Sequence, residues 1–251
     1  MKDTPITYQQ HNKNQAIKVT CSDAYRDPGP DFYLDLNESF PVKITAIGGD
    51  YMPAVLIVDD NSELVQLYTL ILTKGGYQVF SAGDGEQCFS LLGTMLPDLV
   101  LLDIMMEPMD GWEVLTRIRR TGRTAGVPVI MVSGKKPTRG EIQKYIEWVD
   151  DYRIKPLTVK GLKGVVDGFM ASRDTIDHEV LQSGLGGAGD QVQAEYRGLR
   201  RSVTSGTAMV RLLEIPDEEI TRQIDAKKKR LKELQEEYGV ATSSFIESEK
   251  R

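Results

Sequence analysis

The sequence predicts an α/β domain with a doubly wound sheet of five parallel strands, followed by a C-terminal α-helical hairpin or coiled coil. Short aliphatic runs alternate with amphipathic stretches across residues 54–172. These runs contain few polar residues, which is typical of strands buried on both faces of a parallel sheet. Residues 173–251 instead carry apolar residues at helical spacing. Together these patterns predict the two-part architecture.

The predicted strands and helices alternate along the chain. Strands are expected at AVLIVD (54–59), YQVFSA (77–82), DLVLLD (98–103), VPVIMVS (127–133) and VDDYRI (149–154). Helices are expected at 61–74, 85–95, 110–121, 139–147 and from 158 onward. This order describes five βα units. In such a sheet, ligands bind beyond the carboxyl ends of the strands, near the point where the strand order reverses.

Residues 1–53 form an N-terminal extension to which the sequence assigns no fold. The extension is polar and contains five prolines. Within it, AIKVTC and VKITAI alternate in a strand-like way. Met52 directly precedes the first strand of the α/β domain, so one hypothesis is that the working protein begins there. We expect the extension to be weakly structured.

Residues 173–251 predict two helices that pack as an antiparallel hairpin. One apolar stripe contains Leu199, Val203, Val210 and Leu213, with Gly206 in the same seam. The other contains Ile220, Ile224, Leu231, Leu234 and Tyr238, and Lys227 interrupts it. Each stripe must pack against the other or against a second copy of the chain. The preceding SGLGGAG, at 183–189, predicts a flexible linker.

Composition limits the partners and the compartment. The net charge of -6 argues against long-range attraction of the whole protein to nucleic acid or to anionic lipid. The basic run KKKR at 227–230 is flanked by acidic residues, which favours a salt-bridged helix face. No apolar run is long enough to insert in a membrane. The two cysteines, Cys21 and Cys88, are too few for a disulfide framework and fit a reducing cytoplasm.

Polar side chains follow four of the predicted strands. Asp59 and Asp60 end the first strand, Asp103 ends the third, Ser133 ends the fourth, and Lys155 follows the fifth. These residues should converge on one edge of the sheet. Clustered carboxylates repel one another, and a hard divalent cation removes that cost. Because oxygen ligands favour Mg²⁺, which commonly bridges to phosphate, the sequence predicts a magnesium site that acts on a phosphoryl group.

These motifs resemble the receiver domain of two-component response regulators. They are Asp59-Asp60, Asp103 in LLDIMMEPMDGWEVL, Ser133 in IMVSG and Lys155-Pro156 in YRIKPL. The resemblance covers about 120 residues of the chain. It implies a flavodoxin-like receiver fold and a phosphorelay function with a sensor histidine kinase as the phosphoryl donor.

The resemblance also implies the role of each acidic residue. Asp103 would be the nucleophile that becomes an aspartyl phosphate. Asp60 and Asp103, with the backbone carbonyl of Met105, would bind Mg²⁺. Asp59 would act mainly through a coordinated water.

The remaining motif residues would sense the phosphoryl group. Lys155 would neutralise one phosphate oxygen and Ser133 would hydrogen-bond another. The loop of Ser133 and the side chain of Tyr152 would then repack and change the face made by the fourth helix, fifth strand and fifth helix. The resemblance further implies a cis peptide bond between Lys155 and Pro156.

The sequence departs from the family pattern in the loop after the phosphoacceptor. The proline that usually lies four residues after the phosphoacceptor is replaced by Glu107, and proline follows as Pro108. In the family, the positions of Met105 and Lys135 influence how fast the acyl phosphate hydrolyses. Because both side chains are long, we expect the aspartyl phosphate to persist for minutes or longer.

Three functions remain open on the sequence alone. The first is a phosphoacceptor protein that signals to a downstream effector, or to itself as a homodimer, without turning over a separate substrate. The second is a DNA-binding transcriptional regulator with an atypical C-terminal effector, although the charge makes nucleic acid an unlikely partner. The third is a phosphorelay intermediate that passes its phosphoryl group to another histidine.

Overall fold

The computed structural model describes residues 6–9, 16–20, 43–47, 52–213 and 217–240. The chain divides into two compact units, Met1–Met52 and Pro53–Arg251. In the first unit, β1 (Ile6–Gln9), β2 (Ala16–Thr20) and β3 (Lys43–Ile47) form an antiparallel sheet in that order. The two segments with strand-like alternation are β2 and β3. The sequence did not predict β1, and Cys21 lies outside the described residues.

The second unit contains the predicted sheet of five parallel strands. The strands are β4 (Ala54–Val58), β5 (Gln78–Ala82), β6 (Leu99–Leu102), β7 (Val129–Ser133) and β8 (Asp151–Ile154). Their order is β5-β4-β6-β7-β8, and every neighbouring pair is parallel. The doubly wound fold class is therefore confirmed. The strand order reverses at β4, so the crevice predicted for a ligand lies between the ends of β4 and β6.

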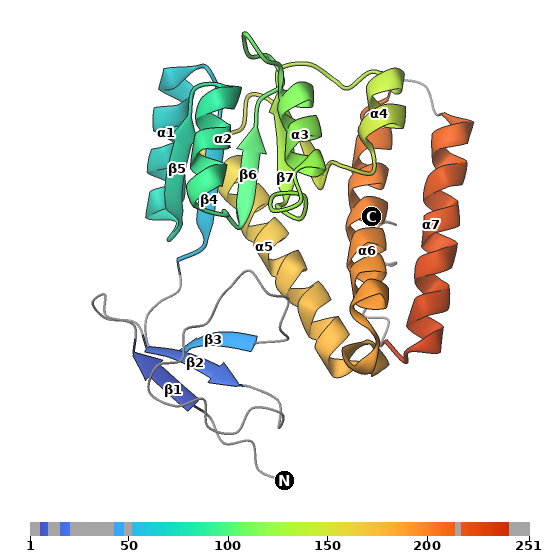
Figure 1. Cartoon of the computed structure of the whole chain (residues 1–251). Coiled ribbons are helices and arrows are strands. Elements are labelled where there is room, and N and C mark those ends of the chain that lie inside the picture. The colour runs from blue at the N-terminus through green and yellow to red at the C-terminus, as the bar shows by residue number, and fades with distance from the viewer. Residues whose placement is uncertain (1–5, 10–15, 21–42, 48–51, 214–216, 241–251) are drawn as a thin grey trace. The chain divides into compact units, whose positions relative to one another are not determined.

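Five helices connect and follow these strands (Figure 1). They are α1 (Ser62–Lys74), α2 (Gly85–Thr94), α3 (Gly111–Arg120), α4 (Arg139–Tyr145) and α5 (Val159–Gln182). Each begins at a polar side chain that accepts a hydrogen bond from a backbone N–H of the first turn, as helix starts require. In α3 and α4 the cap is a reciprocal capping box, formed by Asp110 with Glu113 and by Thr138 with Glu141.

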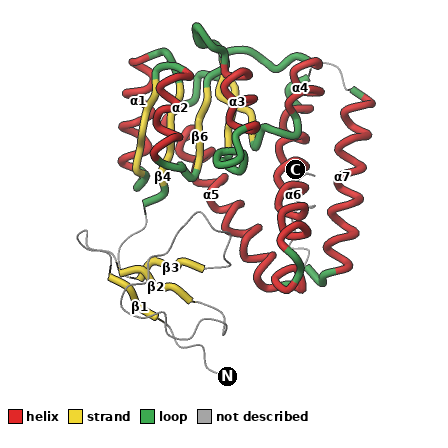
Figure 2. The backbone as a smooth tube through the Cα atoms, in the orientation of Figure 1, coloured by secondary structure: helices red, strands yellow, loops and turns green. Residues whose placement is uncertain are grey.

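The strands direct alternate side chains to two separate cores. In β4, Val55 and Ile57 pack with α1 and α5, whereas Leu56 and Val58 pack with α2 and α3. Helices thus cover both faces of the sheet (Figure 1 and Figure 2). This double burial explains why the strands are almost continuously aliphatic.

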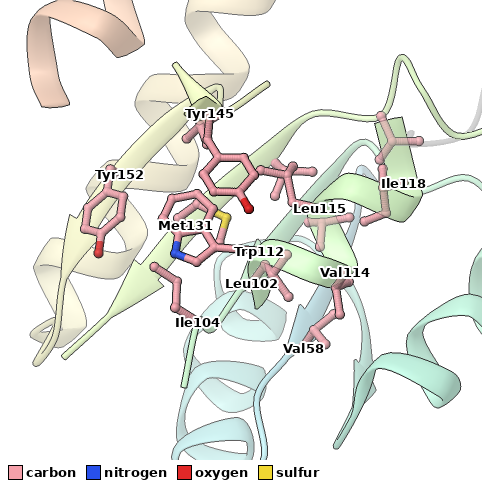
Figure 3. Packing of buried hydrophobic residues seen from close by; sticks show 14 of the residues in the cluster. Val58, Leu102, Ile104, Trp112, Val114, Leu115, Ile118, Met131, Tyr145 and Tyr152 are labelled. Carbon is pink, nitrogen blue, oxygen red and sulfur yellow. The ribbon is translucent and has the colours of Figure 1, made fainter. Parts of the chain in front are cut away.

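An aromatic group closes the core on the side of α4 and β8. The rings of Trp112 and Tyr145 stack with their centroids 4.3 Å apart and their planes 5° apart. Tyr152 of β8 lies next to them, with its ring centroid 6.4 Å from that of Trp112. Figure 3 shows the three side chains gathered together within the buried cluster. They connect α3, α4 and β8 through contact of large apolar surfaces.

The C-terminal residues form a helical hairpin, as predicted. Its helices are α6 (Asp190–Val210) and α7 (Glu218–Glu237). They lie side by side and run in opposite directions (Figure 1). Before them, α5 continues to Gln182, past the boundary of 172 expected for the α/β domain. Among the described residues, the structure contains no helix that is both long and apolar enough to cross a membrane.

The glycine-rich segment is a packed turn rather than the flexible linker that its composition predicted. Gly184–Gly187 form a short 3-10 helix, η1, and Leu185 is fully buried. The N–H of Gly184 donates a hydrogen bond of 2.8 Å to the carbonyl of Tyr238. A Cβ on Gly184 would lie 2.9 Å from that carbonyl oxygen. The glycine therefore permits close backbone approach, which composition alone does not distinguish from flexibility.

The apolar stripes of the hairpin pack in two places. One group forms a core with the end of α5 and contains Ile176, Val180, Leu185, Tyr196, Val203, Leu231, Leu234 and Val240. The other group, Met209, Ile220 and Ile224, belongs to the same cluster as the α2–α4 side of the sheet. The stripes thus contact each other, as expected, and also contact the α/β domain.

A buried carboxylate ties the hairpin to the sheet. Asp150, just before β8, accepts hydrogen bonds of 2.9 Å from the Arg119 guanidinium of α3 and from the Val129 N–H. Arg201 of α6 lies 3.6 Å from its other oxygen. Burial raises the pKa of Asp150, although both arginines oppose this effect. Breaking such a pair leaves a buried charge without a partner.

Asp150→Ala should lower the free energy of unfolding by about 3–5 kcal/mol, because it leaves Arg119 buried without its carboxylate. Chemical denaturation followed by circular dichroism measures the loss. Glu86→Ala is the control, since the ion pair of Glu86 with Arg117 is exposed and should contribute about 1 kcal/mol or less. Equal effects of the two substitutions would contradict the assigned role of Asp150.

Candidate functional site

The ends of β4 and β6 bring two carboxylates together. The N–H of Asp59 donates to the carbonyl of Ala82 at 3.1 Å, and the N–H of Asp103 donates to that of Val58 at 2.8 Å. These bonds continue the sheet by one residue at its carboxyl edge. The two aspartates are 4% and 5% exposed, whereas Asp60 is exposed. The acidic group therefore consists of two buried carboxylates and one that faces solvent.

The three carboxylates are close enough to hold one metal ion. One oxygen from each of Asp59, Asp60 and Asp103 lies within 4.8 Å of the other two. The ammonium of Lys155 is 2.6 Å from Asp59 Oδ2 and 3.1 Å from Asp103 Oδ2. Lys155 thus supplies part of the positive charge that offsets the repulsion between the carboxylates. Three carboxylates and one ammonium leave an excess of two negative charges, and the oxygen donors fit a hard divalent cation.

Lys155 is held at the site by its backbone and by its charge. Its N–H donates a hydrogen bond of 2.8 Å to the carbonyl of Ser133, at the end of the neighbouring strand. Burial alone would lower the pKa of Lys155, but hydrogen bonding to Asp59 and attraction to Asp103 raise it above its usual value. The ammonium is therefore retained. The Lys155–Pro156 peptide bond is cis, as predicted, and so is Glu107–Pro108.

Ser133 and Tyr152 meet at the backbone of Lys135. The fully buried hydroxyl of Ser133 accepts a hydrogen bond of 3.3 Å from the Lys135 N–H. The hydroxyl of Tyr152 donates a bond of 2.8 Å to the Lys135 carbonyl. Burial is the main cause that raises the pKa of Tyr152 to about 12, so this hydroxyl keeps its proton. Ser133 and Tyr152 thus both hydrogen-bond the backbone of Lys135, in the loop that follows β7.

Sequence reasoning missed Glu141 of α4. Its Oε1 accepts hydrogen bonds from the Trp112 indole at 2.9 Å and from the Lys135 ammonium at 3.1 Å. Its Oε2 accepts one of 2.7 Å from the Thr138 N–H. The Thr-x-x-Glu spacing of a capping box was readable in the sequence, but the contacts with α3 and with the site loop were not.

Sequence reasoning also missed Gly111, the first residue of α3. A Cβ at this position would lie 2.0 Å from the carbonyl oxygen of Asp103. The N–H of Gly111 donates a hydrogen bond of 3.0 Å to the carbonyl of Ile104. Because a side chain would displace the Asp103 backbone, Gly111 fixes the position of the site.

The loop after β6 leaves Met105 at the surface, where its side chain is 59% exposed. Its backbone carbonyl remains a predicted metal ligand. Cys88, which lies away from this loop, is fully buried in the core, and burial raises the pKa of its thiol to about 12.

Part of this chain is similar to known receiver domains and response regulators. The sequence profile of the response regulator receiver domain matches residues 55–167. The DNA-binding dual master transcriptional regulator RpaA of Synechocystis sp. is 34% identical over 132 residues, which cover 53% of this chain and 55% of RpaA. The DNA-binding response regulator MtrA of Mycobacterium tuberculosis is 32% identical over 127 residues, which cover 51% and 54%. The chain therefore spans about half the length of the curated relatives it matches.

One similar solved structure is the N-terminal domain of a response regulator receiver protein from Methanoculleus marisnigri. It is 40% identical, with a TM-score of 0.41, and the match covers 48% of this chain and 98% of that one. RpaA and MtrA are both DNA-binding regulators, so these similarities do not support the expectation that nucleic acid is an unlikely partner. Residues 55–167, which make up less than half of the chain, are thus similar to the response regulator receiver domain.

Proposed function

We propose that this chain is the phosphoacceptor of a two-component system and receives a phosphoryl group on Asp103 from a sensor histidine kinase. The observation that carries the proposal is the gathering of the Asp59, Asp60 and Asp103 carboxylates within 4.8 Å, with the Lys155 ammonium beside them. Phosphoryl transfer depends mainly on alignment and charge neutralisation, and this group offers both.

The transfer is a displacement at phosphorus. A carboxylate oxygen of Asp103 attacks, and its bond to phosphorus forms as the P–N bond of the donor phosphohistidine breaks. The imidazole nitrogen leaves with the electron pair and takes up a proton. Lys155, already 3.1 Å from Asp103, would neutralise an oxygen of the transferred group.

The acidic residues would hold the metal that this transfer needs. Asp60, Asp103 and the backbone carbonyl of Met105 would be its ligands, and Asp59 would act through a coordinated water. Bound Mg²⁺ would neutralise charge that develops on the phosphoryl oxygens. The donor set of three carboxylates, without histidine or thiolate, supports Mg²⁺ rather than zinc or copper.

Signalling would begin at Ser133. Its hydroxyl would donate a hydrogen bond to the new phosphate, and this movement would disturb the bond that it now accepts from the Lys135 N–H. Tyr152, which bonds the carbonyl of Lys135, would respond to the same movement. Because the acceptor is a residue of the chain itself, we expect no turnover of a separate substrate.

A DNA-binding regulator is the second candidate, favoured by the similarity of this chain to the DNA-binding regulators RpaA and MtrA. Against it, two members of the basic run have acidic partners in the hairpin. Lys228 lies 3.8 Å from Asp225, and Arg230 lies 2.7 Å from Glu195. Retention of the chain on duplex DNA that falls steeply with added salt would favour this candidate. Transfer from Asp103 to a histidine phosphotransfer protein would instead identify a phosphorelay intermediate.

Asp103→Asn should abolish phosphorylation, because the amide lacks the nucleophilic carboxylate. Intact-mass measurement after incubation with acetyl phosphate and Mg²⁺ checks this. Asp110→Asn is the matched control on the same loop, since asparagine also caps a helix. The proposal would be wrong if the mass of the wild-type chain did not increase by one phosphoryl group with either acetyl phosphate or histidine kinases.

Mg²⁺ should raise the melting temperature of the wild-type chain and should have little effect on Asp60→Asn. A cation that binds the folded state stabilises it by about 2–3 kcal/mol at a hundredfold excess over its Kd. Differential scanning fluorimetry across a Mg²⁺ titration measures the shift. Glu63→Gln, an exposed acid in the first turn of α1, should keep the wild-type response. An equal Mg²⁺ response in Asp60→Asn would contradict the assigned ligand set.

The aspartyl phosphate should persist for minutes or longer. Met105 follows Asp103 by two residues and Lys135 follows Ser133 by two, and their long side chains would hinder attacking water. A phosphate-release assay at saturating Mg²⁺ measures the lifetime, and Met105→Gly should shorten it. Complete loss of the phosphoryl group within seconds in the wild type would show that neither side chain protects it.

A further inference from the structure

A cleft lies between α5 and α6 at the amino-terminal edge of the sheet. Its volume is about 430 Å³, within the range of roughly 300–1,000 Å³ that is usual for small-molecule sites. Residues from the segment before β7, from the start of β8, from α5 and from α6 line it. Figure 1 shows that α5 and α6 meet near η1 and diverge as they approach the sheet. The candidate phosphoacceptor site lies at the opposite, carboxyl edge, so the cleft is separate from it.

Three of the arginines that line the cleft each have a carboxylate partner. Arg153 lies 2.6 Å from Asp151, Arg173 lies 3.1 Å from Asp98, and Arg197 lies 2.9 Å from Asp177. Each of these pairs is neutral as a whole. They therefore add no net charge to the lining.

The fourth arginine, Arg201 of α6, shares its carboxylate with another arginine. It lies 3.6 Å from Asp150, which already accepts hydrogen bonds from Arg119 and from the Val129 N–H. The other donors of Arg119 are bonded to backbone carbonyls. Among the described residues, the guanidinium of Arg201 donates no hydrogen bond. One carboxylate between two guanidinium groups leaves one positive charge, and Arg201 brings it to the cleft together with open N–H donors.

Two glycines of α5 leave space in the cleft. Gly164 and Gly168 are about one helical turn apart, and a Cβ on either would have no atom within 4 Å. Glycine inside a helix is less stable than alanine, and no close packing contact requires it at these positions. The apolar residues Val165, Phe169 and Ile176 of the same helix also line the cleft. This side of the cleft thus offers apolar surface with room beside it.

We infer that the cleft is a binding site for a small organic anion that carries one carboxylate on an apolar, aromatic body. The carboxylate would pair with Arg201, because a planar guanidinium can donate two parallel N–H bonds to the two oxygens. The aromatic body would lie against Val165, Phe169 and Ile176, in the space that the two glycines leave. This inference does not depend on the phosphoacceptor function.

Isothermal titration calorimetry of the full chain with 1-naphthoate tests the charge requirement, and 1-naphthalenemethanol is the uncharged comparison. Naphthoate should bind about tenfold more tightly or better, because only it supplies a carboxylate for a charged hydrogen bond. Arg201→Gln should abolish this difference. Arg201→Lys should keep part of it, since the charge remains without the planar pair of donors.

Arg222→Gln is the matched control for the loss of charge, because Arg222 is an exposed residue of α7 that does not line the cleft. It should bind naphthoate as the wild type does. Equal affinity of the wild type for the two ligands, no binding of naphthoate up to millimolar concentration, or an unchanged preference in Arg201→Gln would overturn the inference.

Gly168→Leu tests the location of the site. The new side chain would occupy the cleft, so the affinity for naphthoate should fall about tenfold or more. Because leucine favours a helix more than glycine does, the variant should stay folded, which its melting temperature by circular dichroism checks. Gly93→Leu is the control, since Gly93 is an exposed glycine of α2 with open space around its Cβ. Wild-type affinity in Gly168→Leu, or an equal loss in Gly93→Leu, would contradict the assigned cleft.

Discussion

The contact of Lys155 with Asp59 and Asp103 is the constraint on which the site depends. Two nearly buried carboxylates at adjacent strand ends would repel each other, and the ammonium at 2.6 Å and 3.1 Å holds them together. The backbone makes this possible, since Lys155 bonds the Ser133 carbonyl and Asp103 bonds the Val58 carbonyl. The sheet therefore places the Lys155 ammonium where it offsets part of the negative charge of the carboxylates. The charge that remains suits a divalent cation.

The sequence was sufficient for the sheet and for the residues at its edge. Alternating burial in β4 and the capping residues of the helices follow local rules that a single sequence displays. The strand-end position of Asp59, Asp103 and Ser133 then follows from the topology, because parallel strands end on one edge. The resemblance to a known family added the individual roles, which spacing alone does not give.

What the sequence could not provide are contacts between distant segments. Glu141 joins Lys135 and Trp112 from two other elements, and Asp150 joins Arg119 and Arg201 across α3 and α6. Periodicity describes one element at a time, so such meetings are invisible to it. The glycines of η1 illustrate the same limit, since composition predicts freedom whereas the fold uses their small size.

The C-terminal hairpin packs on the α/β domain through buried apolar residues and through ion pairs. Here the buried apolar residues supply the attraction, whereas the ion pairs of Arg139 and Lys227 involve partly exposed partners and contribute modestly. Burial of apolar surface therefore accounts for most of the stability of this contact, and the ion pairs add little to it.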